Sequence, residues 1–255
     1  MKIHRRAFLK TSVAATTAAS VCSDPGAVAI ADALTREQRD KLTPAQVIEL
    51  MKKGNQRFLR GERTTHDYLA QQRASAKGQY PSAVFLTCID SRAPAETIMD
   101  LGIGDVFNAR VAGNVSNDDI LGSMEFACKV SGAKVVLVMG HTACGAVKGA
   151  IDRVVLGNLT ALLAKIKEAV VTTAYQGERS AKNYAFVDAV ARTNVELTIA
   201  EIRRRSPVLA GLEAQGAIRI ADAEGEDEVD EAGDDTERGD RLTPARAVRA
   251  ERNQR

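Results

Sequence analysis

Two cysteines and a histidine occupy positions where a metal site could form. Cys88 opens the segment Cys88-Ile89-Asp90-Ser91-Arg92, while His141 and Cys144 lie 53 and 56 positions further along the chain. Two thiolates and an imidazole suit zinc, and three protein ligands leave the fourth tetrahedral position open, as in catalytic zinc sites. Spacing alone also allows a second interpretation, in which both cysteines are ordinary buried thiols and His141 is a core or capping residue.

A carboxylate and a guanidinium accompany the first cysteine. Asp90 is two residues beyond Cys88, and Arg92 is two residues beyond Asp90. A carboxylate so close to a zinc thiolate can ligate the metal or accept a hydrogen bond from its water, and an arginine can grip it bidentately and keep it ionised. The alternative is a surface ion pair at the end of a strand.

The segments around these residues alternate between strand and helix patterns. Apolar, β-branched runs predict strands, and apolar residues at helical spacing predict helices, with Thr43 as N-cap and Pro44 at the first position of the first helix. The expected strands are 83–87, 105–111, 134–139 and 217–220, and the expected helices are 45–59, 120–130, 143–155, 159–171 and 184–205. This order predicts a single-domain α/β fold, a Rossmann-like sheet of mostly parallel strands flanked by helices.

The predicted strands place the chemistry-bearing residues together. Strand 83–87 runs directly into Cys88, and strand 134–139 into Gly140 and His141. Groups just past the carboxyl ends of parallel strands meet in one crevice, which is the usual ligand site of such a sheet. We therefore expect Cys88, His141 and Cys144 to converge there.

Composition and charge exclude several classes of protein. The 255 residues are 45% hydrophobic and 27% charged, which is ordinary for a globular chain and excludes disorder throughout. A formal net charge of +2 gives no overall signature of nucleic-acid binding. No apolar run reaches the roughly 18 residues of a membrane-spanning helix, and four irregularly spaced cysteines do not form a disulfide framework.

The two motifs in combination resemble those of the β-class carbonic anhydrases. The residues that carry the resemblance are Cys88-Ile89-Asp90-Ser91-Arg92 and His141-Thr142-Ala143-Cys144-Gly145. Further similarity in segments 54–58, 104–114 and 123–127 extends it over about residues 45 to 220.

The resemblance implies one zinc ion per subunit, with Cys88, His141 and Cys144 as ligands. Asp90 would be a fourth ligand in a closed state or the partner of zinc-bound hydroxide in an open state, and Arg92 would hold Asp90 off the metal. Gln56 and Gly145 would belong to the substrate pocket. Gln56 would reach a partner's pocket in a homodimer or larger homo-oligomer.

The implied reaction is the reversible hydration of CO2 to bicarbonate and a proton, by attack of zinc-bound hydroxide. Zinc lowers the pKa of its water towards about 7. Because two thiolates make zinc a weaker Lewis acid than imidazoles do, activity is expected to improve above neutral pH. His66, in a polar loop, is expected to be an ordinary surface histidine.

The N-terminus is typical of an export signal. Lys2, Arg5 and Arg6 precede a mildly apolar stretch and small residues, and the arginine pair followed by x-Phe-Leu-Lys resembles a twin-arginine signal. We expect residues 1–33 to be this signal, recognised by the twin-arginine export machinery, and the protein to reach the periplasm or otherwise be exported in a bacterium. A disordered basic tail is the alternative.

The C-terminus departs from the family pattern. Residues 34–220 form the expected zinc domain, and 221–255 an atypical, disordered tail that is first acidic and then basic. The hairpin that usually follows the fourth strand is missing, so that strand would be an uncovered sheet edge, open to pairing or aggregation.

Two further functions remain open at this point. One is hydrolysis of CS2 or COS on the same zinc site, which relatives of this fold perform. The other is a truncated, non-catalytic zinc-binding protein that uses its acidic tail to bind a partner.

Overall fold

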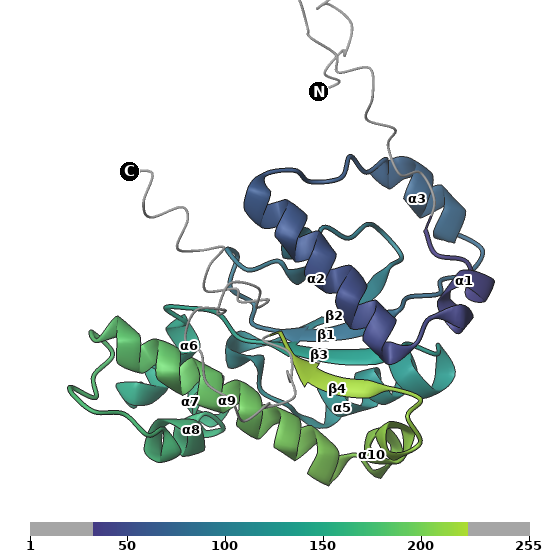
Figure 1. Cartoon of the computed structure of the whole chain (residues 1–255). Coiled ribbons are helices and arrows are strands. Elements are labelled where there is room, and N and C mark those ends of the chain that lie inside the picture. The colour runs from purple at the N-terminus through teal and green to yellow at the C-terminus, as the bar shows by residue number, and fades with distance from the viewer. Residues whose placement is uncertain (1–32, 224–255) are drawn as a thin grey trace, which may run out of the picture.

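The computed structural model describes residues 33–223, so the predicted signal, apart from residue 33, and the predicted tail after residue 223 lie outside the described residues. Four strands form one sheet in the order β2-β1-β3-β4, and every neighbouring pair is parallel. The strands are β1 (Ala83–Thr87), β2 (Val106–Arg110), β3 (Val135–Met139) and β4 (Arg219–Asp222). Helices pack on both faces (Figure 1), which confirms the predicted α/β fold.

Ten α-helices, one 3-10 turn (η1) and one π-helical turn (η2) surround the sheet within residues 33–223. They are α1 (Arg36–Lys41), α2 (Pro44–Arg60), α3 (Tyr68–Ser75), α4 (Ala95–Ile98), η1 (Ala112–Asn114), α5 (Asp118–Glu125), η2 (Phe126–Val130), α6 (Gly145–Ile151), α7 (Gly157–Ala164), α8 (Lys167–Thr172), α9 (Tyr184–Arg205) and α10 (Pro207–Ala214). None of these helices is long and apolar enough to cross a bilayer.

The central strands are buried on both faces, which is why they appear in the sequence as continuous apolar runs. Every residue of β1 and β3 is buried. Side chains alternate along a strand, so Val84 and Leu86 enter the layer formed with η2, α9 and α10, whereas Ala83 and Phe85 enter the layer formed with α2 and α4. The carboxyl ends of β1 and β3 are thereby fixed between two helical layers.

The helices mostly match their predicted positions, and the differences lie at breaks within them. The Thr43 side chain accepts from the Gln46 amide in a capping box, with Pro44 in the first turn, which confirms the predicted start of α2. The helix predicted over 120–130 is present, but its second half is the π-helical turn η2 rather than α-helix. The helix predicted over 159–171 is divided into α7 and α8 around the fully buried Ile166.

The fourth strand begins and ends two residues later than predicted, and its edge is better protected than expected. The backbone amide of Arg219 donates to the Lys134 carbonyl on the β3 side. The N–H and C=O of the next residue, Ile220, therefore point to the opposite side. There the Ile220 amide donates to Glu213 Oε1 at 2.9 Å, and Arg203 donates to the Ile220 carbonyl at 3.0 Å. The expectation of an edge with open hydrogen-bonding groups is therefore wrong at Ile220.

Candidate metal centre

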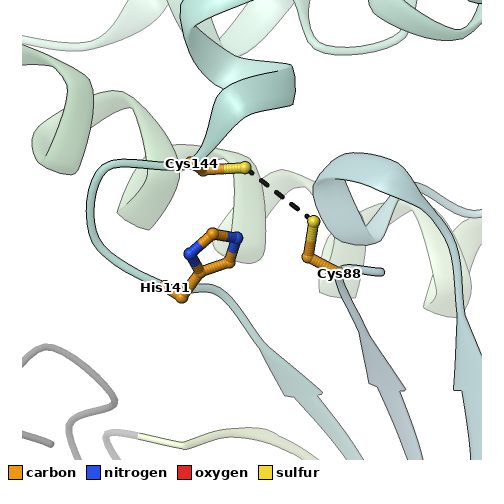
Figure 2. Close-up of side chains that lie close together, drawn as sticks. All are labelled: Cys88, His141 and Cys144. Carbon is orange, nitrogen blue, oxygen red and sulfur yellow. Dashed lines mark hydrogen bonds between the residues drawn. The ribbon is translucent and has the colours of Figure 1, made fainter. Parts of the chain in front are cut away.

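Cys88, His141 and Cys144 come together at the carboxyl end of the sheet. The register pairs Thr87 of β1 with Met139 of β3, so the residues that follow these two leave adjacent strands side by side. The ligand atoms of the three side chains all lie within 4.8 Å of one another, and the two sulfurs are 4.0 Å apart. All three residues are buried, and Figure 2 shows Cys88 and His141 just beyond two strands with Cys144 at the start of a helix.

Close backbone packing shapes the loops that carry these residues. A Cβ at Gly140 would lie 2.9 Å from Val195 on α9, so only glycine lets that helix approach the end of β3. Gly113 has φ +69°, and a Cβ there would lie 2.5 Å from Ile166. The two glycines allow α9 and η1 to close around the cluster.

The surroundings of Cys88 favour its thiolate. A hydrogen bond from Cys144 is the largest influence that lowers the pKa of Cys88, and it outweighs the opposing effect of burial. The backbone amides of Gly113 and Asp90 lower this pKa further, and the Gly113 nitrogen lies 3.3 Å from the Cys88 sulfur. The same hydrogen bond, together with burial, raises the pKa of Cys144. Of the two thiols, Cys88 is therefore the more acidic.

The imidazole of His141 is oriented as a metal ligand would be. Its Nδ1 lies 3.0 Å from the Thr142 carbonyl, and because a carbonyl only accepts, Nδ1 carries the proton. Its Nε2 is buried and has no hydrogen-bond partner among the described residues. A free imidazole lone pair beside two cysteine sulfurs is the donor set that zinc prefers, and a carbonyl on the other nitrogen is the usual support of such a ligand. The residues present therefore fit a zinc ion.

Asp90 and Arg92 form a bidentate ion pair beside the cluster. The Arg92 side chain donates through Nε to Asp90 Oδ1 at 3.0 Å and through a terminal nitrogen to Oδ2 at 2.8 Å, and the Arg92 amide also donates to Oδ1. Asp90 Oδ2 is 3.8 Å from His141 Nε2. The hydrogen bonds from Arg92 hold the pKa of Asp90 well below its usual range, so this carboxylate is ionised.

Comparison with known proteins identifies the family. The family model described as carbonic anhydrase matches residues 83–224. Carbonic anhydrase 2 of Mycobacterium tuberculosis is 34% identical over 179 residues, which are 69% of this chain and 86% of that protein. The chain belongs to the β-class carbonic anhydrase family. The carbonic anhydrase of Mycolicibacterium smegmatis matches with the same identity and the same coverage of both chains.

Solved β-carbonic anhydrases share the fold. A crystal structure from the ascomycete Sordaria macrospora, described as one of two tetrameric β-carbonic anhydrases, matches with a TM-score of 0.52 and 26% identity. The match covers 58% of this chain and 76% of the other. The fold similarity extends the family assignment to the arrangement of the sheet and its helices.

Two further site residues, Gly145 and Gln56, were predicted for this β-carbonic anhydrase. Gly145 is the first residue of α6, directly after Cys144, and open space lies where its Cβ would point. Gln56 is half-buried on α2, and no hydrogen bond within the described residues joins it to the cluster. The structure thus brings together Cys88, Asp90, Arg92, His141, Cys144 and Gly145.

The expectation of a surface position for His66 is wrong. Its side chain is only 4% exposed, and Nε2 lies 3.5 Å from Asp100 Oδ1. Arg57 also donates to the buried Asp100, at 2.6 Å. His66 therefore belongs to a buried ionic group that joins the end of α2 to the loop after α4.

Sequence reasoning missed several residues that support the cluster from a distance. Arg110 at the end of β2 donates to the carbonyls of Cys88 and Asp90, at 2.8 and 2.6 Å. On α9, Asp188 accepts from the Ala143 amide between two proposed ligands, and Asn194 donates to the carbonyl of Gly113, whose amide contacts Cys88. The one signal in the sequence was a carboxylate and an amide on a helix face otherwise occupied by buried apolar residues.

Proposed function

We propose that this chain catalyses the zinc-dependent, reversible hydration of CO2 to bicarbonate and a proton. The observation that carries the proposal is the buried group of Cys88, His141 and Cys144, in which His141 Nε2 faces two sulfurs without a hydrogen-bond partner in the described part of the chain. Membership of the family supports the same reaction. The proposed cofactor is one zinc ion per subunit.

The proposed ligands are the two sulfurs and His141 Nε2. When bound, zinc supplies the Lewis acidity that makes water available as a nucleophile near neutral pH. The amides of Gly113 and Asp90 stabilise negative charge on Cys88, so this thiol is prepared to bind a cation. Because both thiolates donate charge to the metal, we expect activity to increase as the pH rises above neutral.

Asp90 is proposed to orient the water that attacks CO2. Arg92 donates to both carboxylate oxygens, yet each oxygen has two lone pairs, so Oδ2 can accept a further hydrogen bond beside His141. If the water donates its O–H to Asp90 Oδ2, its lone pair points away from the carboxylate and towards CO2. The bidentate grip of Arg92 supports this role for Asp90 over that of a fourth metal ligand.

The pocket and the assembly are part of the proposal. Open space beside Gly145 supports a substrate position at the start of α6. Gln56 is half-buried on α2 and makes no hydrogen bond to the cluster within the described residues, and we propose that it serves the pocket of a partner in a homodimer or larger homo-oligomer. The tetrameric enzymes of Sordaria macrospora support such an assembly. Light scattering on the purified chain measures its mass, and a monomer that hydrates CO2 would contradict this part of the proposal.

Export through the twin-arginine pathway is proposed from the sequence of residues 1–33. This pathway moves folded protein, so zinc can bind before Cys88 and Cys144 meet an oxidising compartment. Replacement of Arg5 and Arg6 by lysine should keep the chain in the cytoplasm, as fractionation would show. Continued export of that double variant would contradict a twin-arginine signal.

The decisive test is stopped-flow CO2 hydration by the purified chain at about pH 8.5, with zinc content measured on the same sample. We expect fast hydration that a chelator abolishes and added zinc restores. A folded, zinc-loaded chain without hydration would overturn the proposal. Assaying that sample with CS2 and COS would then distinguish a hydrolase on the same site from a non-catalytic zinc-binding protein.

A further inference from the structure

Helix α9 contacts the backbone of both regions that shape the metal centre. It runs for 22 residues, and two polar side chains on it, Asp188 and Asn194, bond to loops far away in the sequence. The partner of Asp188 is 45 positions away, and the partner of Asn194 is 81 positions away. Neither bond is needed to form the helix itself.

Asp188 holds the turn between two of the proposed ligands. Its Oδ1 accepts from the Ala143 amide at 2.7 Å. Ala143 lies between His141 and Cys144 and has φ +55°, a left-handed conformation that is unfavourable for a residue with a Cβ. A strained turn persists only where its surroundings hold it, and the carboxylate of Asp188 is such a restraint.

Asn194 fixes the residue whose amide supports the other sulfur. Its Nδ2 donates to the Gly113 carbonyl at 2.8 Å, and the Gly113 amide in turn donates to the Cys88 sulfur. Asn194 is 3% exposed, so its hydrogen bond is shielded from water. Gly113 is thus held through its carbonyl while its N–H is directed at Cys88.

We propose that Asp188 and Asn194 are positioning residues that set the Cys144 and Cys88 sulfurs at the spacing a metal ion requires. Each acts through one backbone group, Asp188 through Ala143 and Asn194 through Gly113. A single rigid helix thereby aligns ligands from the ends of two different strands. The inference rests on the proposed function for the identity of the metal, but its test measures binding and geometry separately from catalysis.

The test compares zinc affinity and the absorption spectrum of the cobalt-substituted full chain across matched variants. Asp188→Ala and Asn194→Ala remove the hydrogen bonds, whereas Asp188→Asn keeps an oxygen that can accept from Ala143. Glu196→Ala changes an exposed residue of the same helix and serves as the control. Competition with a chromophoric chelator gives the affinity, and the thiolate-to-cobalt bands report the sulfur geometry.

We expect the two alanine variants to bind zinc about 10- to 100-fold more weakly, the range typical of lost outer-shell partners, and to have shifted cobalt bands. Asp188→Asn and Glu196→Ala should match the wild type in both. A merely structural role would lower thermal stability without moving the bands of the folded protein. Folded alanine variants with wild-type affinity and wild-type bands would overturn the inference.

Two longer side chains keep the test informative where an alanine variant does not fold. Asp188→Glu and Asn194→Gln retain the charge or the amide but displace the bonding atom, so shifted cobalt bands are expected, and unshifted bands would count against the inference. Hydration by the wild type is measured alongside. A wild type that binds zinc without hydrating CO2 would refute the proposed function, while the positioning role would still be decided by affinity and spectrum.

Discussion

Two regions of the sheet differ in the hydrogen bonding of their polar groups. At the carboxyl ends of β1 and β3, His141 Nε2 is left without a hydrogen bond within residues 33–223, although the other ring nitrogen is bonded to a carbonyl. At the outer edge of β4, the N–H and C=O of Ile220 are both bonded, to Glu213 and to Arg203. Figure 1 shows β4 beside α9 and α10, the helices that carry these two side chains.

The β4 edge is completed by an ion pair that replaces a neighbouring strand. Arg203 donates to both oxygens of Glu213, at 2.8 and 3.1 Å, while the two side chains bond the carbonyl and the amide of Ile220. Both backbone groups of Ile220 and both oxygens of Glu213 are thus bonded. An unpaired strand edge invites association with another chain, and these bonds remove that opportunity at the centre of β4.

The cluster has a donor atom free for a ligand, whereas the β4 edge has its polar groups bonded within the chain. An unpaired buried nitrogen is costly, and at this cluster the proposed metal ion would complete its bonding. Metal removal and substitution should therefore have large effects at the cluster and modest effects at the β4 edge. The following predictions test that contrast.

The largest effect is expected from Cys144→Ser. A serine hydroxyl is a poor zinc ligand beside a thiolate and an imidazole, so zinc affinity should fall by more than about 100-fold, beyond the range for outer-shell changes. CO2 hydration should be lost with the metal. Zinc content after dialysis and stopped-flow hydration measure the two losses on one sample.

Cys128→Ala provides the matched control for that experiment. Cys128 is as buried as the cluster cysteines, but it lies in the apolar layer with η2, where burial alone raises the pKa of its thiol to about 12. Its removal should leave zinc binding and turnover unchanged. Full zinc content with normal turnover in Cys144→Ser would refute the ligand assignment.

A large effect confined to catalysis is expected from Asp90→Asn. The substitution keeps the shape of the side chain but replaces one acceptor oxygen by an NH2 group, so the side chain can no longer accept from both Arg92 and the water, and kcat should fall by roughly 100-fold, the cost of a misplaced reacting group. Zinc content should stay at the wild-type level, because Asp90 is proposed not to ligate the metal. Ser91→Ala, at the exposed neighbour, is the control. Unchanged turnover would remove Asp90 from the mechanism, and loss of zinc would make it a ligand.

The same contrast explains what the sequence could predict. Strands β1 and β3 were predictable because burial on both faces demands continuous apolar residues. The convergence of Cys88 with His141 followed from parallel pairing, because both residues lie within two positions of a strand end. Local patterns and one general rule of sheet topology were therefore enough to predict that these side chains converge.

The supporting residues could not be predicted in this way. Each of three side chains, Asp188, Asn194 and Glu213, bonds to a backbone group elsewhere in the fold. These groups come within reach only after α9 and α10 have packed on the sheet. The division of α7 from α8 depends likewise on Ile166, which packs against Gly113. Such contacts depend on tertiary packing, which the periodicity of the sequence does not predict.

The smallest effect is expected at the β4 edge, from Glu213→Gln. Burial raises the pKa of Glu213, but the hydrogen bonds from Arg203 and the Ile220 amide, with the charge of Arg219, lower it more, so the net shift is downward. A carboxyl group with a depressed pKa stabilises the fold above its unfolded pKa of about 4.3 and loses that contribution as the pH falls through its folded value. Glu213→Gln should therefore lower the free energy of unfolding by about 1–2 kcal/mol at pH 7, and the difference from wild type should shrink below about pH 4. Urea denaturation of wild type and variant across this range measures it, with Glu201→Gln, at a more exposed carboxylate paired with Arg205, as a control expected to cost less than about 0.5 kcal/mol. A difference that persists unchanged at low pH would show that the charge of Glu213 does not stabilise this edge.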